Sequence, residues 1–150
     1  MSHPKVSVIT VNYNHKYFPK LAVEALERSR ANFDFEIVYV DNASTDPISL
    51  GFLQQAARDG RIKLVHSEKN LGFGAGNNLG ARYAQGDYFF ILNPDTAVLE
   101  DTLQKLMVTL DNFLKQMSDY KEEFTILKGE VDKIKSFIKE KFGVEIAVQG

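Results

Sequence analysis

Short apolar runs and amphipathic stretches alternate over the first two thirds of the chain. Four runs rich in β-branched and aromatic residues predict strands, at Lys5–Val11, Phe35–Val40, Ile62–His66 and Asp87–Leu92. Three stretches with helical spacing lie between them, at Phe18–Arg30, Ile48–Asp59 and Gly76–Gln85, and Gly60 and Gly86 are expected to end the last two. This order predicts an α/β fold, with an open, mostly parallel sheet of Rossmann-like type and helices on both faces.

The remaining third of the chain has a different period. Apolar residues recur there at alternating spacings of three and four, which is a heptad pattern. We call these residues the heptad strip: Leu103, Leu106, Leu110, Phe113, Met117, Tyr120, Phe124, Leu127, Val131, Ile134 and Ile138. The pattern predicts an α/β domain over residues 1–100 and a helical tail over 101–150. The tail either pairs with another copy through residues 103–138 or folds back on the sheet.

Charged residues flank the strip in a regular way. With Leu103 at heptad position a, Glu123 and Glu130 fall at g, and Lys128 and Lys135 fall at e. These signs are complementary in a parallel pair of helices. Within the tail, Gly129 could divide the helix into two, Gly143 is expected to end it, and Val144–Val148 could form a short strand.

Composition narrows the class of protein. The 150 residues are 44% hydrophobic, with 18 Lys and Arg against 20 Asp and Glu. This excludes a mainly disordered chain and argues against nucleic acid as a partner. There is no cysteine, so disulfides and thiolate chemistry are excluded. No apolar run approaches a membrane span, and a cytoplasmic protein is expected.

Polar residues follow each predicted strand, and the carboxyl ends of parallel strands meet at one edge of a sheet. Asn12 and Tyr13 follow the first strand, and Asp41 follows the second. Asp41 could accept hydrogen bonds from a nucleotide or could simply form a turn, and position alone does not separate these alternatives. Ser44, Thr45 and Asp46 are typical of turns and helix caps. Four such loops at one edge favour a ligand site.

The other two loops carry further candidates. Residues 72–80 contain four glycines, which allow close backbone approach to a ligand or close helix packing. Their spacing fits neither a dinucleotide-binding loop nor a Walker loop. Asn93, Pro94 and Asp95 follow the last strand, where Asp95 could hold a divalent cation or belong to a plain turn. Of the histidines, His66 is expected to be structural, and His15, in a loop at a strand end, could touch a ligand.

Taken together, four segments resemble family 2 glycosyltransferases of the GT-A fold, most closely the rhamnosyltransferase-like branch. These segments are Val6–Asn14, Val40–Asp46, Asn70–Asn78 and Leu92–Thr96, and the resemblance covers residues 4–107. It implies transfer of a sugar from a UDP- or dTDP-linked donor to an acceptor hydroxyl with inversion, in polysaccharide biosynthesis.

The resemblance also implies roles for particular residues. Asn12 and Tyr13 would lie near the base, and Asp41 would contact the base or ribose. The segment that borders the nucleotide sugar would include Asn70, Gly74 and Asn77. Asn93 and Asp95 occupy the place of the family's Asp-x-Asp motif, with Asp95 as the ligand of Mg²⁺ or Mn²⁺ and Asn93 in place of the first acid.

The tail departs from the family pattern. No acceptor site and no carboxylate base of the family's kind is recognisable after Met107, so the catalytic base is not assigned. The sequence therefore leaves two interpretations open. One is a nucleotide-sugar-binding glycosyltransferase domain whose acceptor half is missing, and the other is a non-catalytic assembly or regulatory module that keeps this fold and oligomerises through its tail.

Overall fold

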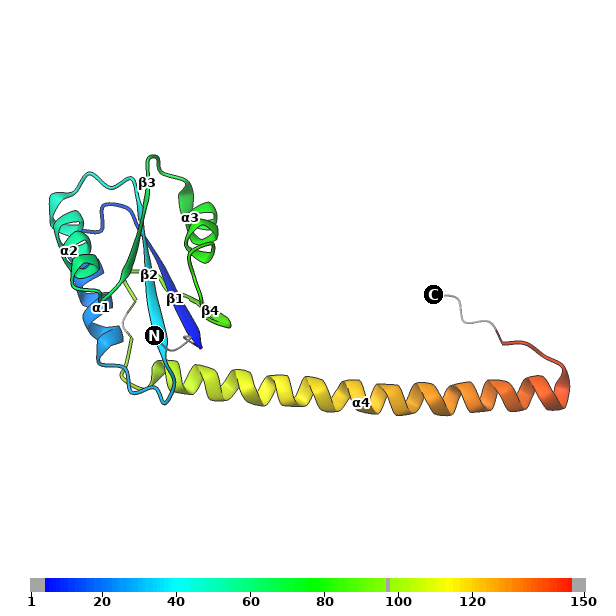
Figure 1. Ribbon diagram of the computed structural model, residues 1–150. Coiled ribbons are helices and arrows are strands. Elements are labelled where there is room, and N and C mark those ends of the chain that lie inside the picture. Colours follow the sequence, from blue (N-terminus) through cyan, green and yellow to red (C-terminus); the bar gives the residue numbers. More distant parts are fainter. Residues whose placement is uncertain (1–4, 97, 147–150) are drawn as a thin grey trace. The chain divides into compact units, whose positions relative to one another are not determined.

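The computed structural model describes residues 5–96 and 98–146, and the elements follow each other within them as Figure 1 shows. The strands are β1 Val6–Asn12, β2 Phe35–Asn42, β3 Lys63–Ser67 and β4 Tyr88–Ile91. The helices are α1 Phe18–Glu27, α2 Pro47–Arg58, α3 Gly72–Ala81 and α4 Thr102–Phe142. The chain divides into two compact units, Met1–Lys105 and Leu106–Gly150, and we call the first the sheet unit.

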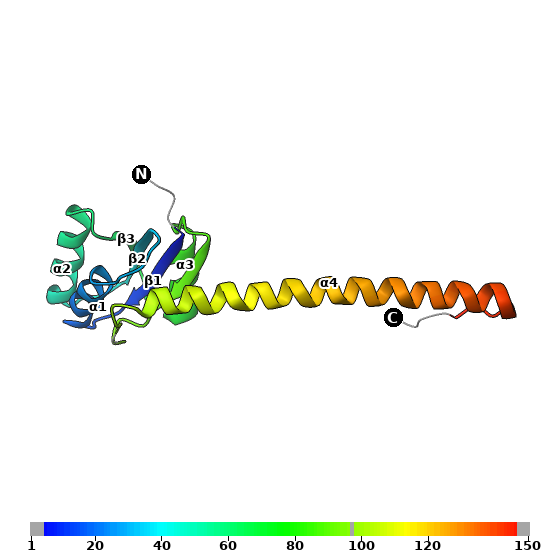
Figure 2. The same ribbon diagram turned by 90° about the horizontal axis from the view of Figure 1, so that it is seen from below.

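The sheet has the strand order β3-β2-β1-β4, and every neighbouring pair is parallel. Helices α1 and α2 lie on one face and α3 lies on the other, as both views show (Figures 1 and 2). This confirms the predicted open parallel sheet with helices on both faces. Because both faces are covered, β1 and β2 are almost continuous apolar runs.

The face of the sheet beneath α3 is packed unusually closely. Ile9, Val11 and Val40 are among the buried residues there. A Cβ atom added at Gly80 would lie 2.6 Å from Ile9 Cγ2 and 3.0 Å from Val40 Cγ2, and one added at Gly76 would lie 2.9 Å from Val11 Cγ1. Two of the glycines in this segment therefore serve close helix packing, one of the two roles expected for them.

The bounds of α3 correct the prediction from the sequence. The helix begins at Gly72, four residues before the predicted start, so the glycine-rich segment 72–80 lies within the helix and is not a loop before it. It ends at Ala81 in a turn in which Tyr83 N and Ala84 N donate to Gly80 O. The predicted terminator Gly86 instead lies against β1, where an added Cβ would be 2.6 Å from Ser7 N.

Helix α1 also ends earlier than predicted, at Glu27 instead of Arg30. Arg30 N donates to Glu100 O, and Arg30 Nε lies 2.8 Å from a carboxylate oxygen of Glu100. The residues just after α1 therefore contact a segment 70 residues away. The predicted end of α2 is confirmed, since Asp59 is the C-cap and Gly60, with φ of 72°, follows it.

Glu36 at the start of β2 joins several parts of the sheet unit. Its carboxylate accepts hydrogen bonds from Ser7 Oγ at 2.6 Å, Lys63 Nζ at 3.0 Å and Gln85 N. Burial alone would raise the pKa of Glu36, but these donors outweigh it and hold the pKa below its ordinary value. The charged form of Glu36 therefore stabilises the folded sheet unit.

Helix α4 is a single helix over Thr102–Phe142, so the division at Gly129 is wrong. It ends where expected, with Gly143 at φ of 66° and Gly143 N donating to Lys139 O. Leu103 is buried within the sheet unit, so the heptad strip is open only from Leu106 onward, and its predicted start is corrected.

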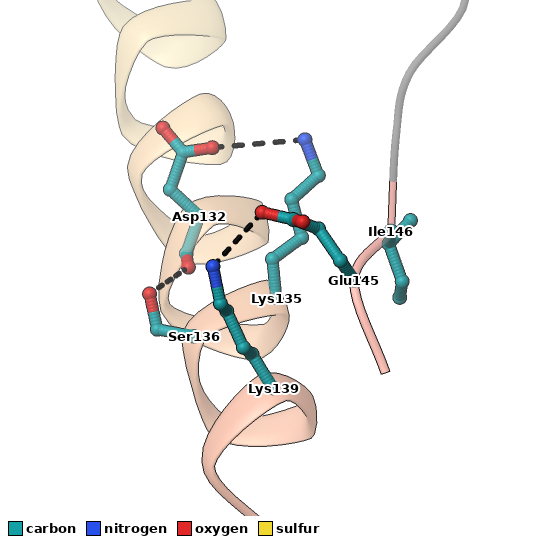
Figure 3. A pocket seen from close by; sticks show the side chains of 6 residues that line it. All are labelled: Asp132, Lys135, Ser136, Lys139, Glu145 and Ile146. Carbon is teal, nitrogen blue, oxygen red and sulfur yellow. Dashed lines mark hydrogen bonds and ion pairs between the residues drawn. The ribbon is translucent and has the colours of Figure 1, made fainter. Parts of the chain in front are cut away.

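The chain turns back along α4 after Gly143, and a small pocket lies at this turn (Figure 3). Lys139 Nζ contacts Glu145 Oε1 at 2.9 Å and holds the returning segment. Residues 144–146 form no strand, and the rest of the expected strand lies outside the described residues. Within 5–96 and 98–146, no helix is both long enough and apolar enough to cross a membrane.

Candidate functional site

Three polar residues form a row across the carboxyl edge of the sheet. Asn12 at the end of β1 is the register partner of Asp41 in β2, and Asp41 is the partner of His66 in β3. Strands of a parallel sheet place such partners side by side, so residues far apart in the sequence meet here. This row is the centre of the candidate site.

The loops after β1 and β2 are tied together by side chains. Asn12 Nδ2 donates to Ser44 Oγ at 3.0 Å and to Ser49 Oγ at 3.3 Å. Asn14 N also donates to Ser44 Oγ, and Asn14 Oδ1 accepts from Thr45 N at 2.7 Å. These bonds make Asn12, a predicted ligand contact, a buried residue that holds the two loops in place.

Tyr13 lies between these two anchored asparagines and is exposed. Asn14 has φ of 58°, a left-handed conformation that asparagine tolerates better than most residues. The sequence offered no indication of a particular role for Asn14, although asparagine is typical of such turns. The exposed Tyr13 ring is thus presented on a fixed turn.

Asp41 is buried, with only 2% of its side chain exposed. Its Oδ1 accepts from Ser44 N at 3.2 Å, which is the turn interaction that the sequence allowed. Its Oδ2 lies 2.9 Å from His66 Nδ1, and the His66 side chain is 63% exposed. A carboxylate can accept about four hydrogen bonds, so Asp41 keeps capacity for a further donor.

Asn42 organises the segment that leads into α3, a role that the sequence did not indicate. Asn42 Nδ2 donates to Asn70 Oδ1 at 2.9 Å, and Asn42 Oδ1 accepts from Leu71 N at 2.9 Å. Asn70 Oδ1 also accepts from Gly72 N at 2.8 Å. Asn70 is therefore occupied in shaping the start of the helix.

Asn77 and Gly74, the other candidates here, differ in their surroundings. Asn77 is buried, its Nδ2 donates to Phe73 O at 2.9 Å, and its Oδ1 has no hydrogen-bond partner among the described residues. Gly74 is exposed, and a Cβ added there would meet nothing within 4 Å. The unpartnered Asn77 oxygen is the uncommon feature, because buried polar atoms are usually satisfied.

The segment Asn93–Asp95 leaves the sheet just after β4. Leu92 N still donates to Ile9 O of β1 at 2.9 Å, and Thr96 N donates to Asn93 O at 3.1 Å to close a turn. Pro94 is buried in this turn, whereas Asn93 and Asp95 are exposed. The turn therefore holds the Asp95 carboxylate out from the sheet unit.

Asp95, the metal ligand that the sequence predicts, lies in the part of the chain that the structure describes. No group of three or more His, Cys, Asp or Glu side chains is gathered there to hold an ion. A single exposed carboxylate fits Mg²⁺ or Mn²⁺ only if substrate phosphate oxygens and water complete the coordination, which is how such ions are commonly bound in nucleotide sites.

Asp46 caps α2 by accepting from Ser49 N at 2.8 Å, which confirms its expected capping role. The same backbone hydrogen bond is the main cause that lowers the pKa of Asp46.

His15 lies against Phe18, with ring centroids 6.2 Å apart. His66 was expected only to be structural, but the structure places it in the central row beside Asp41.

The sheet topology and the polar carboxyl edge are those of a GT-A type fold. A family model, "Glycosyl transferase family 2", matches residues 7–121. The chain therefore belongs to glycosyltransferase family 2, as the four sequence segments predicted.

Curated relatives agree with this assignment. An uncharacterized glycosyltransferase of Haemophilus influenzae is 32% identical over 118 residues, which are 77% of this chain and 44% of the relative. The putative teichuronic acid biosynthesis glycosyltransferase TuaG of Bacillus subtilis is 36% identical over 104 residues, 68% of this chain and 40% of TuaG. The chain thus spans less than half the length of these relatives.

Solved structures show the same likeness. TarS residues 1–349 from S. aureus, crystallised with UDP, aligns with a TM-score of 0.62 and 26% identity, over 72% of this chain and 32% of TarS 1–349. The mannosyltransferase PcManGT from Pyrobaculum calidifontis, in complex with GDP-Man and Mn²⁺, aligns with a TM-score of 0.59 and 25% identity. The alignment covers 68% of this chain and 31% of the PcManGT chain.

Proposed function

We propose that the sheet unit binds the nucleoside diphosphate of a sugar donor at its carboxyl edge. The observation that carries the proposal is the row of Asn12, Asp41 and His66, with the exposed Tyr13 beside it. Tyr13 offers an aromatic surface for a base. Asp41 and His66 offer polar groups for a base or ribose, and His66 is the more accessible of the two. TarS and PcManGT, which were solved with UDP and GDP-Man, support this ligand class.

Asn70, Gly74 and Asn77 contribute the α3 side of the proposed site. The free Asn77 Oδ1 can accept one hydrogen bond from a hydroxyl or amide of the donor. Exposed Gly74 leaves room above the first turn of α3. Asn70 acts through the backbone that it orders, since its own oxygen already accepts two hydrogen bonds.

Asp95 is the proposed ligand of a divalent cation, with Asn93 beside it in the turn. When bound, Mg²⁺ or Mn²⁺ would offset charge on the diphosphate leaving group of the donor. The Mn²⁺ in the PcManGT complex supports a cation of this kind. The proposed reaction is transfer of the sugar to an acceptor hydroxyl with inversion, and the cytoplasm is the location we expect for it.

Titration calorimetry tests binding directly. The folded chain is titrated with UDP, dTDP and GDP, each with and without Mn²⁺, because the solved relatives bind different bases. We expect millimolar or tighter binding of at least one nucleotide, strengthened by Mn²⁺. Absence of binding to all three at millimolar concentration would overturn the proposal.

Asp95→Ala tests the cation site. We expect the variant to keep its fold, because Asp95 is exposed, and to lose the effect of Mn²⁺ on nucleotide binding. Asp111→Ala removes an exposed carboxylate from α4 and is the matched control, which should respond to Mn²⁺ like the wild type. An unchanged Mn²⁺ response in Asp95→Ala would refute the role of this residue.

A second candidate function is an assembly module without transfer activity. The 41-residue helix α4, with its apolar strip, is the observation that favours it. A sugar-transfer assay and a donor-hydrolysis assay separate the two functions, because an assembly module binds partners but turns over no donor.

A further inference from the structure

Helix α4 carries an apolar strip that the described chain leaves exposed. Phe113, Tyr120 and Phe124 in this strip are 56%, 66% and 68% exposed. Exposed strip residues continue without a gap in the heptad pattern as far as Ile134. Long helices in water gain most of their stability from packing an apolar face. The strip therefore needs a partner surface.

The strip is too long for the sheet unit to cover it. From Leu106 to Ile134 the helix rises about 42 Å at 1.5 Å per residue. The longest strand, β2, has eight residues and a length of about 26 Å. Whatever the placement of the helix, much of the strip would extend past the sheet, so folding back would leave apolar residues in water.

The charges beside the strip fit a second copy of the same helix. In a parallel pair, position g of one helix faces position e of the next heptad on its partner. Glu123 would then face Lys128, and Glu130 would face Lys135. An antiparallel pair would bring Glu against Glu and Lys against Lys. The charge pattern favours the parallel arrangement.

Three of these four charged side chains form no ion pair within the described chain. In the described part of the chain, no ion pair involves Glu123, Glu130 or Lys128, and Lys135 has only a 3.8 Å contact with Asp132. The returning segment after Gly143 is held by Lys139, at heptad position b, and Lys135 at position e lines the same pocket (Figure 3). Ile134 at position d is 58% exposed, so this segment leaves it open to a partner.

We propose that a second copy of this chain covers the heptad strip, and that the two α4 helices form a parallel, in-register, two-stranded coiled coil from Leu106 to Ile138. The last heptads place Val131 and Ile138 at a and Leu127 and Ile134 at d, and of these the two a residues together with Leu127 favour two strands. Since the sheet unit precedes α4 in each chain, the two sheet units share one end of the dimer. The inference does not depend on nucleotide binding.

Single-cysteine variants test orientation and register, because the chain has no cysteine of its own. Position d residues of a parallel pair come within disulfide range, about 4.4–6.8 Å between Cα atoms. We expect Phe113→Cys and Leu127→Cys each to form a covalent dimer on oxidation. Lys115→Cys, at the outward position f, is the matched control and should cross-link at least roughly tenfold more slowly. Equal rates at all three positions would overturn the proposal.

Charge exchange provides a second test without touching the apolar strip. One variant carries Glu123→Lys and Glu130→Lys, and the other carries Lys128→Glu and Lys135→Glu. Each alone should dimerise more weakly than the wild type, and an equimolar mixture should recover dimers, as measured by light scattering. A wild-type monomer or trimer at tens of micromolar would overturn the two-stranded pair, as would two variants that dimerise like the wild type.

Discussion

Gly80 and Gly74 belong to the same helix but have opposite surroundings. Gly80 lies against β1 and β2, where an added Cβ would be 2.6 Å from Ile9 Cγ2, and Gly74 faces open space. The sequence shows four similar glycines in this segment, and only the packing tells them apart. The distinction separates a glycine needed for the fold from one at the surface of the candidate site.

We therefore predict different effects of alanine at these two positions. Gly80→Ala should lower the free energy of unfolding by about 1–3 kcal/mol, because β1 must move to admit the methyl group. Gly74→Ala, the matched control in the same helix, should leave it unchanged or raise it by up to about 1 kcal/mol through helix propensity. Urea denaturation followed by circular dichroism measures both, and equal stabilities would contradict the packing argument.

Some polar residues of the candidate site could be selected from the sequence, and others could be recognised only in the structure. Asn12, Asp41 and Tyr13 could be selected from the sequence because each follows directly on a predicted strand. Asn42 and Ser44 could not, since their importance lies in hydrogen bonds to residues about 30 positions away. Turn-forming residue types do not reveal which of them will be buried between loops.

At the scale of secondary-structure elements, one carboxylate links strands β1, β2 and β3. Glu36 of β2 accepts hydrogen bonds from Ser7 of β1 and Lys63 of β3. Its pKa is lowered, so its charged form contributes stability above the ordinary pKa of 4.5, and that contribution is lost as the pH falls.

We predict that Glu36→Gln lowers the free energy of unfolding by about 1–3 kcal/mol at pH 7, because hydrogen-bond donors lose a charged acceptor. The difference from wild type should shrink as the pH falls below 4.5. Denaturation at several pH values measures it. Glu24→Gln is the control: Glu24 is partly exposed on α1 and forms only a 3.8 Å ion pair with Lys20, so its loss should cost little. A pH-independent difference would contradict the electrostatic origin.

At the scale of the whole molecule, the chain joins two units with different sources of stability. The sheet unit has its own buried core of strand and helix residues. The helix beyond Leu106 has an exposed apolar strip, and in our proposal a second copy covers it. Of the two, only the stability that α4 gains from pairing with a second copy depends on protein concentration.

Thermal unfolding at two concentrations about a hundredfold apart should therefore show two behaviours. Far-ultraviolet circular dichroism, dominated by α4, should report a transition that rises with concentration. Near-ultraviolet circular dichroism of the sheet-unit tyrosines, including buried Tyr39, should report a transition that does not. A helix transition independent of concentration would indicate packing within one chain instead.

The sequence by itself determined the order and type of the elements, the parallel sheet and the family, because apolar β-branched runs, helical spacing and strand-end motifs are local patterns. It also determined the heptad strip, for the same reason. Tertiary structure alone decided that Leu103 is buried in the sheet unit, that Gly80 packs against β1, and that Asp41 meets His66. These depend on contacts between distant segments, and such contacts exist only once the chain has folded.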